Sequence, residues 1–300
     1  MPHPMDIYAE PQRLISVGGR PFNMHVTGEG GQTVVLAAGF LGLTLDWILV
    51  QHALSRQARV VSFDNAGLGF SAPGPEPRST HAIVKDLRAA LVEADLPPPY
   101  LFVGHSAGSL RTRLFAALHP EEAVGLVQVD PVTADWQRRV YGGTSSGMDE
   151  EVALAACLLR LAERGQLTAS TPQLIARLGL PRTDLTPAVT DALVRMWLRP
   201  SYLRTVISEA EGLRTAEVDA CEADRPLGDL PIVVLSAGRI EQSPITNGDP
   251  RKVAAWRAMH DAIAAQSSRG QVRTVDAGHN IPIEAPAAVV SAVQDVLAGR

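Results

Sequence analysis

The most informative stretch of the sequence is residues 100–108, which read YLFVGHSAG and contain a Gly-x-Ser-x-Gly turn. Alone, such a turn arises by chance in roughly one chain in ten of this length. Its setting makes it specific, because an apolar strand, residues 100–103, precedes it and a helix begins near Ala107. A sharp strand-to-helix turn of this kind lifts the serine oxygen above the sheet. The stretch predicts that Ser106 is a nucleophile.

A serine hydroxyl also needs a base within hydrogen-bond reach, because it is a weak nucleophile near neutral pH. His279 follows the predicted strand 271–275 and precedes a helix that begins at Pro286, so its loop opens on the same sheet edge as Ser106. The histidines at 25, 52, 81, 105, 119 and 260 fall in predicted strands and helices or inside the turn itself, which favours structural roles. We therefore expect His279 to be the base.

The negative oxygen that forms during acyl transfer needs hydrogen-bond donors. Residues 38–42, AGFLG, follow the apolar strand 33–37. A backbone N–H from this loop can join the N–H of the residue after the nucleophile to form an oxyanion hole. We assign these two donors to Phe40 and Ala107.

Short apolar strands alternate with amphipathic helices through most of the chain, which predicts an α/β fold with a mostly parallel central sheet flanked by helices. A glycine pair, Gly18-Gly19, predicts a hairpin at the start. The predicted strands are residues 13–17, 22–27, 33–37, 60–63, 100–103, 125–129, 232–236 and 271–275.

Residues 131–226 interrupt this alternation, because they contain no convincing strand. Helix caps and stops predict four helices there, starting near Asp149, Thr171, Thr186 and Ser201. We interpret the segment as an inserted helical cap over a core of residues 1–130 and 227–300. Six apolar side chains exceed what solvated helices need, and we expect some of them to line a pocket over Ser106: Leu158, Leu159, Leu161, Met196, Trp197 and Leu198.

These landmarks resemble the α/β-hydrolase fold superfamily, in its lipase-, esterase- and peroxidase-like branch with a helical cap. The resemblance rests on residues 38–40 (AGF), residues 64–71 (DNAGLGFS), the turn at Ser106 and Gly278-His279, in this order. It implies an α/β-hydrolase core over about residues 13–297. Ala38 departs from the pattern, since many members carry histidine there.

The acid that orients the histidine has two candidates. Asp130 directly follows the predicted strand 125–129, and Glu241 follows the strand 232–236. In relatives the acid follows either of these strands, most often the second. We favour Asp130, because a residue next to a strand is placed accurately, whereas Glu241 opens a long loop rich in Ser, Pro, Asn and Gly.

Composition narrows the functional class. The formal net charge is −5 and no basic stripe is present, so we expect no nucleic-acid partner. The amino-terminal residues lack the apolar run of a signal peptide, no run is long enough for a membrane span, and the two cysteines suit a reducing compartment, which predicts a cytoplasmic protein. No metal-ligand cluster and no phosphate-binding glycine loop is visible, so we infer no metal and no cofactor.

The sequence therefore predicts a serine-dependent hydrolase that cleaves a small apolar ester, thioester or lactone through an acyl-enzyme, with a small molecule as its partner. Two alternatives remain open on the same residues. One is a C–C bond hydrolase or a cofactor-free perhydrolase or haloperoxidase-like enzyme, and the other is a ligand receptor with weak or no turnover. Dehalogenase and epoxide hydrolase chemistry is disfavoured, because it needs a carboxylate in place of Ser106. The oligomeric state is not predicted.

Overall fold

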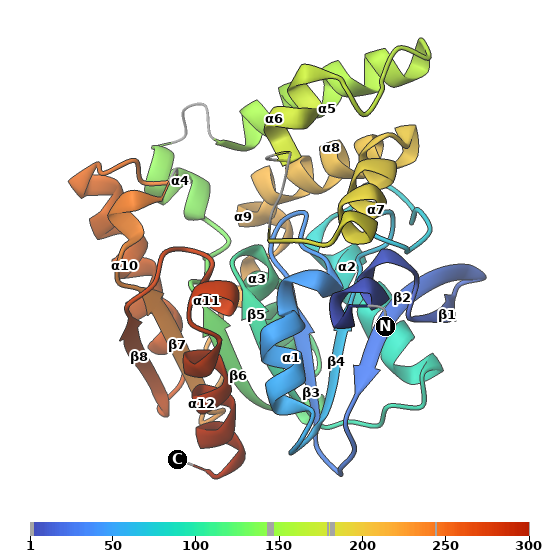
Figure 1. Ribbon diagram of the computed structural model, residues 1–300. Helices are drawn as coiled ribbons and strands as arrows, with labels where there is room; N and C mark the ends of the chain where they lie inside the picture. The colour runs from blue at the N-terminus through green and yellow to red at the C-terminus, as the bar shows by residue number, and fades with distance from the viewer. Residues whose placement is uncertain (1–2, 143–146, 179, 181–183, 244, 300) are drawn as a thin grey trace.

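An eight-stranded sheet forms the centre of the molecule, in the order β1-β2-β4-β3-β5-β6-β7-β8 (Figure 1). The computed structural model describes residues 3–142, 147–178, 180, 184–243 and 245–299. The first three strands in this order pair antiparallel and all the others pair parallel. The strands are β1 (Arg13–Val17), β2 (Arg20–Thr27), β3 (Thr33–Ala37), β4 (Arg59–Phe63), β5 (Tyr100–His105), β6 (Ala123–Val129), β7 (Ile232–Ala237) and β8 (Gly270–Val275).

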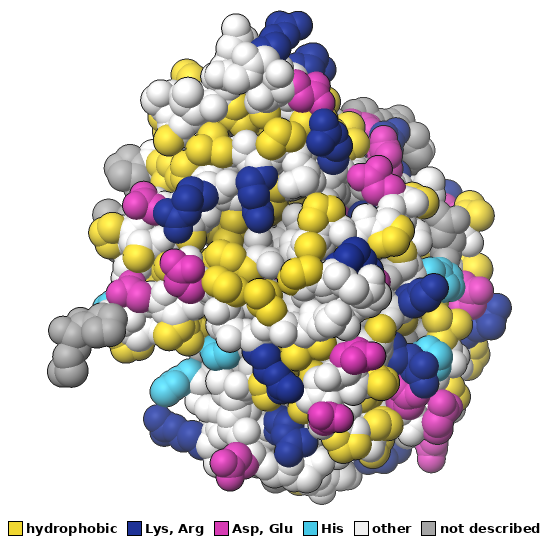
Figure 2. Space-filling view, turned by 90° about the vertical axis from the view of Figure 1, so that its right-hand side faces the viewer, with side chains coloured by type: hydrophobic (Ala, Val, Ile, Leu, Met, Phe, Trp, Pro, Cys, Tyr) yellow, Lys and Arg dark blue, Asp and Glu magenta, His cyan; other side chains and the backbone are white. Residues whose placement is uncertain are grey.

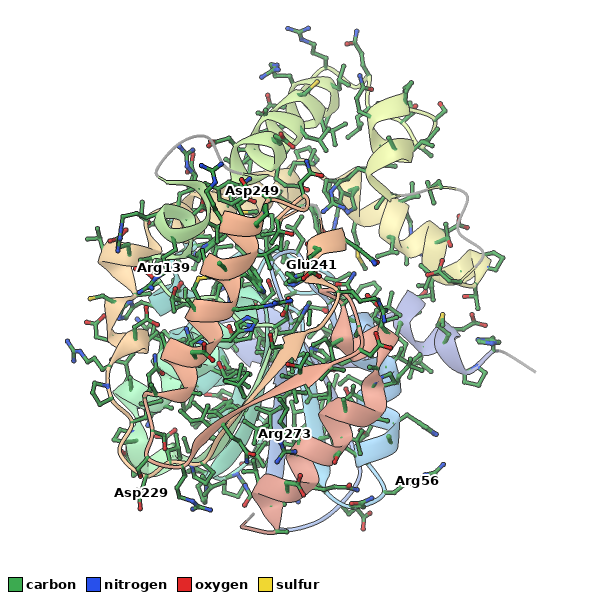
Figure 3. All side chains as sticks on the ribbon, turned by 90° about the vertical axis from the view of Figure 1, so that its left-hand side faces the viewer. Arg56, Arg139, Asp229, Glu241, Asp249 and Arg273 are labelled. Carbon is green, nitrogen blue, oxygen red and sulfur yellow. The ribbon has the colours of Figure 1, made fainter. Side chains whose placement is uncertain are left out.

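Helices cover both faces of this sheet, as the alternating pattern predicts. On one face α1 (Ile48–Leu54) packs against α12 (Pro286–Leu297). On the other face lie α2 (Thr80–Glu93), α3 (Ala107–Leu118) and α10 (Pro250–Ala264) (Figures 1 and 3). The remaining elements of the core are short: η1 (Pro4–Ala9), η2 (Thr44–Trp47), η3 (Pro120–Glu122), η5 (Ile240–Gln242) and α11 (Ile281–Glu284).

The order of the strands creates a crevice at the carboxyl ends of β3 and β5. After β3 the chain adds β4 on one side and then returns to add β5 on the other. The loops that leave β3 and β5 therefore diverge, and ligands of open α/β sheets bind in the crevice outside such a point. Ser106 directly follows β5 at this position.

The segment between β6 and β7 is helical, as predicted. Its elements are α4 (Trp136–Tyr141), α5 (Gly147–Glu163), α6 (Pro172–Leu178), α7 (Pro187–Trp197), α8 (Pro200–Arg214), α9 (Ala216–Asp219) and η4 (Cys221–Asp224). The hydroxyl of Thr186 accepts a hydrogen bond from the N–H of Val189 at 3.3 Å, which confirms the predicted cap of α7. The short helices α4 and α9 were not predicted, because four to six residues give too little periodicity. Helices α5 to α8 lie above the carboxyl ends of the parallel strands (Figure 1).

Two separate apolar clusters stabilise these parts. The larger cluster fills the space between the sheet and its covering helices. The smaller one joins α5, α7 and α8 to η1, and its fully buried members include Leu158, Val189, Leu203 and Val206. The inserted helices thus bury most of their apolar faces against one another and against the amino-terminal segment.

Candidate active site

Ser106 lies at the turn between β5 and α3 in a strained backbone conformation, with φ 50° and ψ −121°. Two glycines allow this turn to pack closely. A Cβ atom at Gly108 would lie 2.1 Å from the carbonyl oxygen of Ala37, and one at Gly104 would lie 2.6 Å from the Cα atom of Ser109. Neither position can hold a side chain, which explains the glycines of the motif and confirms the predicted strand–turn–helix.

A buried carboxylate faces His279. The Oδ2 atom of Asp130 lies 2.6 Å from the Nδ1 atom of His279, and the aspartate side chain is fully buried. Its other oxygen, Oδ1, accepts hydrogen bonds from the backbone N–H of Ala237 at 2.9 Å and from the indole N–H of Trp256 at 3.2 Å. Three donors from three different elements therefore fix the carboxylate in one orientation.

Burial by itself raises the pKa of Asp130, but the hydrogen bond and the charge of His279, with a smaller effect of His260, lower it below its ordinary value. Asp130 is therefore ionised at neutral pH. An ionised carboxylate accepts the Nδ1 proton of His279, which leaves the Nε2 atom of the ring free to accept a proton.

The structure does not bring Glu241 to His279. Glu241 lies on η5 after β7, its side chain is about half exposed, and it pairs with Arg257 of α10 at 2.7 Å (Figure 3). The physical reason is this ion pair, which holds the carboxylate against the exposed side of α10. Of the two candidate acids, only Asp130 contacts the histidine.

Trp256 and His260 were missed as neighbours of the site. Both lie on α10, and their spacing of four residues places them on one face of this helix. His260 is buried; its Nδ1 atom lies 2.8 Å from the hydroxyl of Ser236 and its Nε2 atom 3.7 Å from Asp130. The ring of Trp256 also packs edge-on against His279, with 5.7 Å between ring centroids. The helical spacing could have shown that they share a face, but not that this face covers Asp130.

His105, inside the Gly-x-Ser-x-Gly turn, supports the loop of the histidine. Its Nε2 atom lies 2.9 Å from the carbonyl oxygen of His279, and the two rings lie 4.8 Å apart. Burial, together with the neighbouring His279, lowers the pKa of His105 to about 3. The ring is therefore neutral at pH 7 and donates its Nε2–H to this carbonyl, which agrees with the predicted structural role.

The loop after β3 lies against Ser106. A Cβ atom at Gly39 would be 3.2 Å from the Cβ atom of Ser106. Phe40 and Ala107 line the same cavity as Ser106 and His279. Ala107 is the first residue of α3, so its N–H has no acceptor within the helix. The structure therefore brings both expected oxyanion donors to the cavity that holds the serine.

This cavity has a volume of about 1000 Å³ and lies between the core and the inserted helices. The insertion contributes both apolar and charged residues to its lining: Val132, Trp136, Tyr141, Met148, Leu185 and Leu213, and Glu150, Glu151, Arg177 and Asp184. The expectation that residues such as Leu158, Met196 and Trp197 line it is wrong: these three side chains are buried in the smaller cluster instead. Nor are Leu159, Leu161 or Leu198 among the residues that line it. The cavity wall therefore comes from the two ends of the insertion and also from α5, α6 and the residues just before α7.

Charged side chains of both signs lie on the surface. On the face shown in Figure 2, Lys and Arg side chains alternate with Asp and Glu and form no stripe of one sign. Within the described residues, no helix combines the length and apolar character needed to cross a bilayer.

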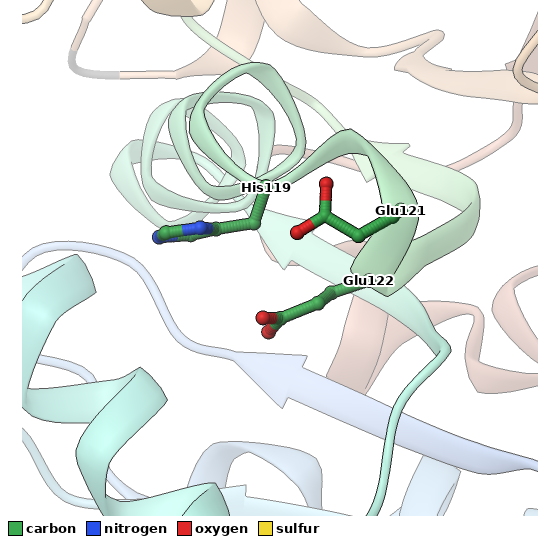
Figure 4. A group of neighbouring side chains, drawn as sticks. All are labelled: His119, Glu121 and Glu122. Atoms are coloured by element: carbon green, nitrogen blue, oxygen red, sulfur yellow. The ribbon is translucent and has the colours of Figure 1, made fainter.

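One group of potential metal ligands occurs in the described part of the chain, at the end of α3: His119, Glu121 and Glu122 (Figure 4). Their ligand atoms lie within 4.8 Å of one another. Arg88, however, donates to both carboxylate oxygens of Glu122 at 2.6–3.2 Å. One of the three potential ligands is therefore already paired with a guanidinium. The group lies at the opposite end of α3 from Ser106, about 18 Å away along the helix. It is therefore remote from the cavity.

Comparison with known proteins agrees with this geometry. A 125-residue stretch is 30% identical to the uncharacterized protein YqjL of Bacillus subtilis; it covers 41% of this chain and 49% of that protein. The chain thus spans about half, or less, of the length of the curated relatives it matches.

Solved structures align over nearly the whole chain. A thermophilic esterase from Thermogutta terrifontis is 22% identical with a TM-score of 0.64, covering 97% of this chain and 99% of the esterase. An enol-lactonase from Burkholderia xenovorans is 19% identical with a TM-score of 0.67, covering 95% and 100%. The α/β hydrolase fold family itself matches residues 32–286. Together with the sheet order and the serine turn, this match shows that the chain belongs to the α/β hydrolase fold family.

Proposed function

We propose that this protein is a serine-dependent hydrolase that cleaves a small apolar ester, thioester or lactone through an acyl-enzyme. One observation carries the proposal: the buried Asp130 carboxylate lies 2.6 Å from the Nδ1 atom of His279, whose ring lines the same cavity as Ser106. A carboxylate, an imidazole and a serine in this relation form the group that activates a hydroxyl for acyl transfer.

The proposed reaction has two halves. The hydroxyl oxygen of Ser106 attacks the carbonyl carbon of the substrate while Nε2 of His279 takes the hydroxyl proton. The carbonyl electrons move to oxygen, which the N–H groups of Phe40 and Ala107 stabilise. The tetrahedral species collapses, and His279 returns the proton to the departing alcohol or thiol. Water then attacks the acyl-enzyme by the same route, releasing the acid and restoring Ser106.

The walls of the cavity support an apolar, uncharged substrate. Phe40, Trp136, Val132 and Leu213 contribute apolar surface, as binding sites for small molecules usually do. The charged side chains along the described lining are mostly acidic. Arg177 is its one arginine, whereas five residues carry carboxylates: Asp46, Glu150, Glu151, Asp184 and Glu284. A negatively charged substrate would meet repulsion there.

We also infer that residues 131–226 form a cap that selects the substrate. The support is the position of α4 and of the end of α8, which supply Trp136, Tyr141 and Leu213 to the cavity. Substrate choice would then depend on these lining residues and not on Leu158, Met196 and Trp197, which are buried in the smaller cluster.

A serine-directed probe tests the nucleophile. We expect a fluorophosphonate to label the wild-type protein once, on Ser106, and to leave Ser106→Ala unlabelled at an unchanged melting temperature. Loss of a triad serine lowers turnover by about a million-fold in a well-studied protease, so the variant should show no measurable ester hydrolysis. Hydrolysis by Ser106→Ala at near the wild-type rate would refute the proposal.

A substrate panel tests the substrate class. We expect neutral esters and lactones with a bulky apolar part to be cleaved with a higher kcat/KM than acetyl esters of small alcohols. A hemisuccinate ester, which carries a carboxylate, should be cleaved more slowly than the neutral butyrate ester of the same alcohol. Turnover of C–C substrates without ester or lactone turnover would point to the other hydrolase class.

A further inference from the structure

A buried ion pair lies behind the loop that carries Phe40. The Nη2 atom of Arg111, on α3, lies 3.1 Å from the Oε2 atom of Glu209, on α8. Both side chains are at least 98% buried. The other oxygen of Glu209 accepts a hydrogen bond from the side-chain amide of Asn65 at 3.0 Å. Taking two charges out of water is costly, so removal of either partner would leave the other charge buried and uncompensated.

The second nitrogen of this guanidinium contacts the oxyanion loop directly. Nη1 of Arg111 donates to the carbonyl oxygens of Ala38 at 3.3 Å and Gly39 at 3.5 Å. The oxygen of Gly39 also accepts a hydrogen bond from the N–H of Gly42 at 3.1 Å. Two donors therefore hold the carbonyl of Gly39 on the protein side of the loop.

The orientation of this carbonyl fixes the orientation of an oxyanion donor. The carbonyl of Gly39 and the N–H of Phe40 belong to one planar trans peptide, so they point in opposite directions. With the carbonyl held toward the buried Arg111, the N–H of Phe40 points away from it. Gly39 itself lies against Ser106, as the Cβ contact of 3.2 Å shows, and Phe40 lines the cavity.

We propose that Arg111 is a positioning residue of the oxyanion hole, which fixes the peptide between Gly39 and Phe40, and that Glu209 of the inserted segment holds Arg111 in place. This inference rests on the proposed function. The conformation of the oxyanion loop then depends on α8. The segment between β6 and β7 would therefore hold a catalytic loop in place in addition to lining the cavity. The charge of Arg111 also polarises the Gly39–Phe40 peptide, which strengthens its N–H as a donor.

The decisive variant is Arg111→Lys. Lysine carries one compact ammonium group and cannot reach the loop carbonyls and Glu209 with the fork geometry of arginine. Loss of one oxyanion donor costs about a hundredfold to a thousandfold in kcat, and misplacement costs less. We expect kcat for a chromogenic butyrate ester to fall roughly tenfold to a hundredfold, with KM little changed. Affinity for phenylboronic acid, whose tetrahedral adduct with Ser106 places an oxygen in the hole, should fall by a similar factor.

Arg78→Lys is the matched control. Arg78 is also 98% buried, pairs with Asp86 at 2.8 Å and donates to the carbonyl of Pro75 at 3.3 Å, but it does not contact the oxyanion loop. This variant should lose comparable thermal stability and retain kcat. A merely structural role for Arg111 predicts the same behaviour for both variants, with no selective loss of boronate affinity.

The double variant Arg111→Met/Glu209→Gln removes both charges and keeps an acceptor for Asn65. It tests the role of Arg111 if Arg111→Lys melts below the assay temperature. Its kcat should also fall. Wild-type kcat and boronate affinity in the folded Arg111 variants, or an equal loss in Arg78→Lys, would overturn the inference alone. A wild-type protein that fluorophosphonate does not label would overturn the proposed function and this inference with it.

Discussion

Replacing Asp130 with asparagine tests the assignment of the acid most directly. In the wild-type protein Oδ1 accepts from Ala237 and Trp256, and Oδ2 accepts from His279. An asparagine side chain has one oxygen and one NH₂ group. Two N–H donors already point at the Oδ1 position, so the amide oxygen must occupy it, and the NH₂ group must face His279.

This orientation forces the wrong tautomer on the imidazole. With an NH₂ group opposite it, Nδ1 of His279 becomes an acceptor and the proton moves to Nε2, where the base should accept the proton of Ser106. The corresponding amide replacement in a serine protease lowers kcat about ten-thousand-fold, equivalent to about 5.5 kcal/mol of transition-state stabilisation. We expect Asp130→Asn to lose activity on this scale.

The assay compares kcat and kcat/KM for one chromogenic ester in the wild-type protein, Asp130→Asn and Glu241→Gln, with melting temperatures as the check of folding. Glu241→Gln removes only a half-exposed ion pair with Arg257, and such pairs contribute about 0–1 kcal/mol to stability. It should therefore keep nearly the wild-type kcat. A loss of several orders of magnitude confined to Glu241→Gln, or an Asp130→Asn variant within tenfold of wild type, would refute the assignment.

Two further variants test the surroundings of the imidazole. Trp256→Phe keeps an aromatic ring but removes one of the three donors to Asp130, so we expect kcat to fall roughly tenfold with KM unchanged. A change in KM with wild-type kcat would contradict a role of Trp256 in orienting the carboxylate. The pKa of His105 is about 3 in the folded protein and about 6.5 in the unfolded chain. Below about pH 6.5 the unfolded chain therefore binds a proton that the folded protein does not, and the free energy of unfolding decreases as the pH falls. From about pH 7 to about pH 5 this amounts to roughly 2 kcal/mol. His105→Gln retains an N–H donor and should weaken the pH dependence of chemical denaturation by about that amount. Parallel curves for the two proteins would argue against a neutral His105.

The positions of Ser106 and His279 could be predicted because their signals are local. Residues 100–108 contain the strand, the turn and the start of the helix in one stretch, and His279 directly follows a recognisable strand. The carboxylate that contacts His279 was harder to predict, because Asp130 and Glu241 both follow strands that end at the same sheet edge. The donors that distinguish them, Ala237 and Trp256, lie more than 100 residues from Asp130 in the sequence. No local pattern reports such contacts.

The cavity wall illustrates the same limit. Helix caps such as Thr186 correctly placed the inserted helices, because capping depends on three or four neighbouring residues. The apolar residues at the end of α7 also indicated that it buries a surface, but they do not say which of two neighbours covers that surface. Met196 and Trp197 are buried beside the other inserted helices, whereas Trp136, on the six-residue helix α4, lines the cavity.

The end of β7 explains how a histidine after β8 reaches an aspartate after β6, although β7 lies between these strands. The chain after β8 bends over the end of β7, where the N–H groups of Gly238 and Arg239 donate to the carbonyls of Val275 at 2.7 Å and Ala277 at 3.0 Å. A Cβ atom at Gly238 would lie 2.8 Å from the oxygen of Val275, so a side chain there would hold the two segments apart. The same turn aims the N–H of Ala237 at Asp130. The glycine that follows β7 therefore allows the close approach that lets His279 pass over this strand and lie against Asp130, the residue after β6.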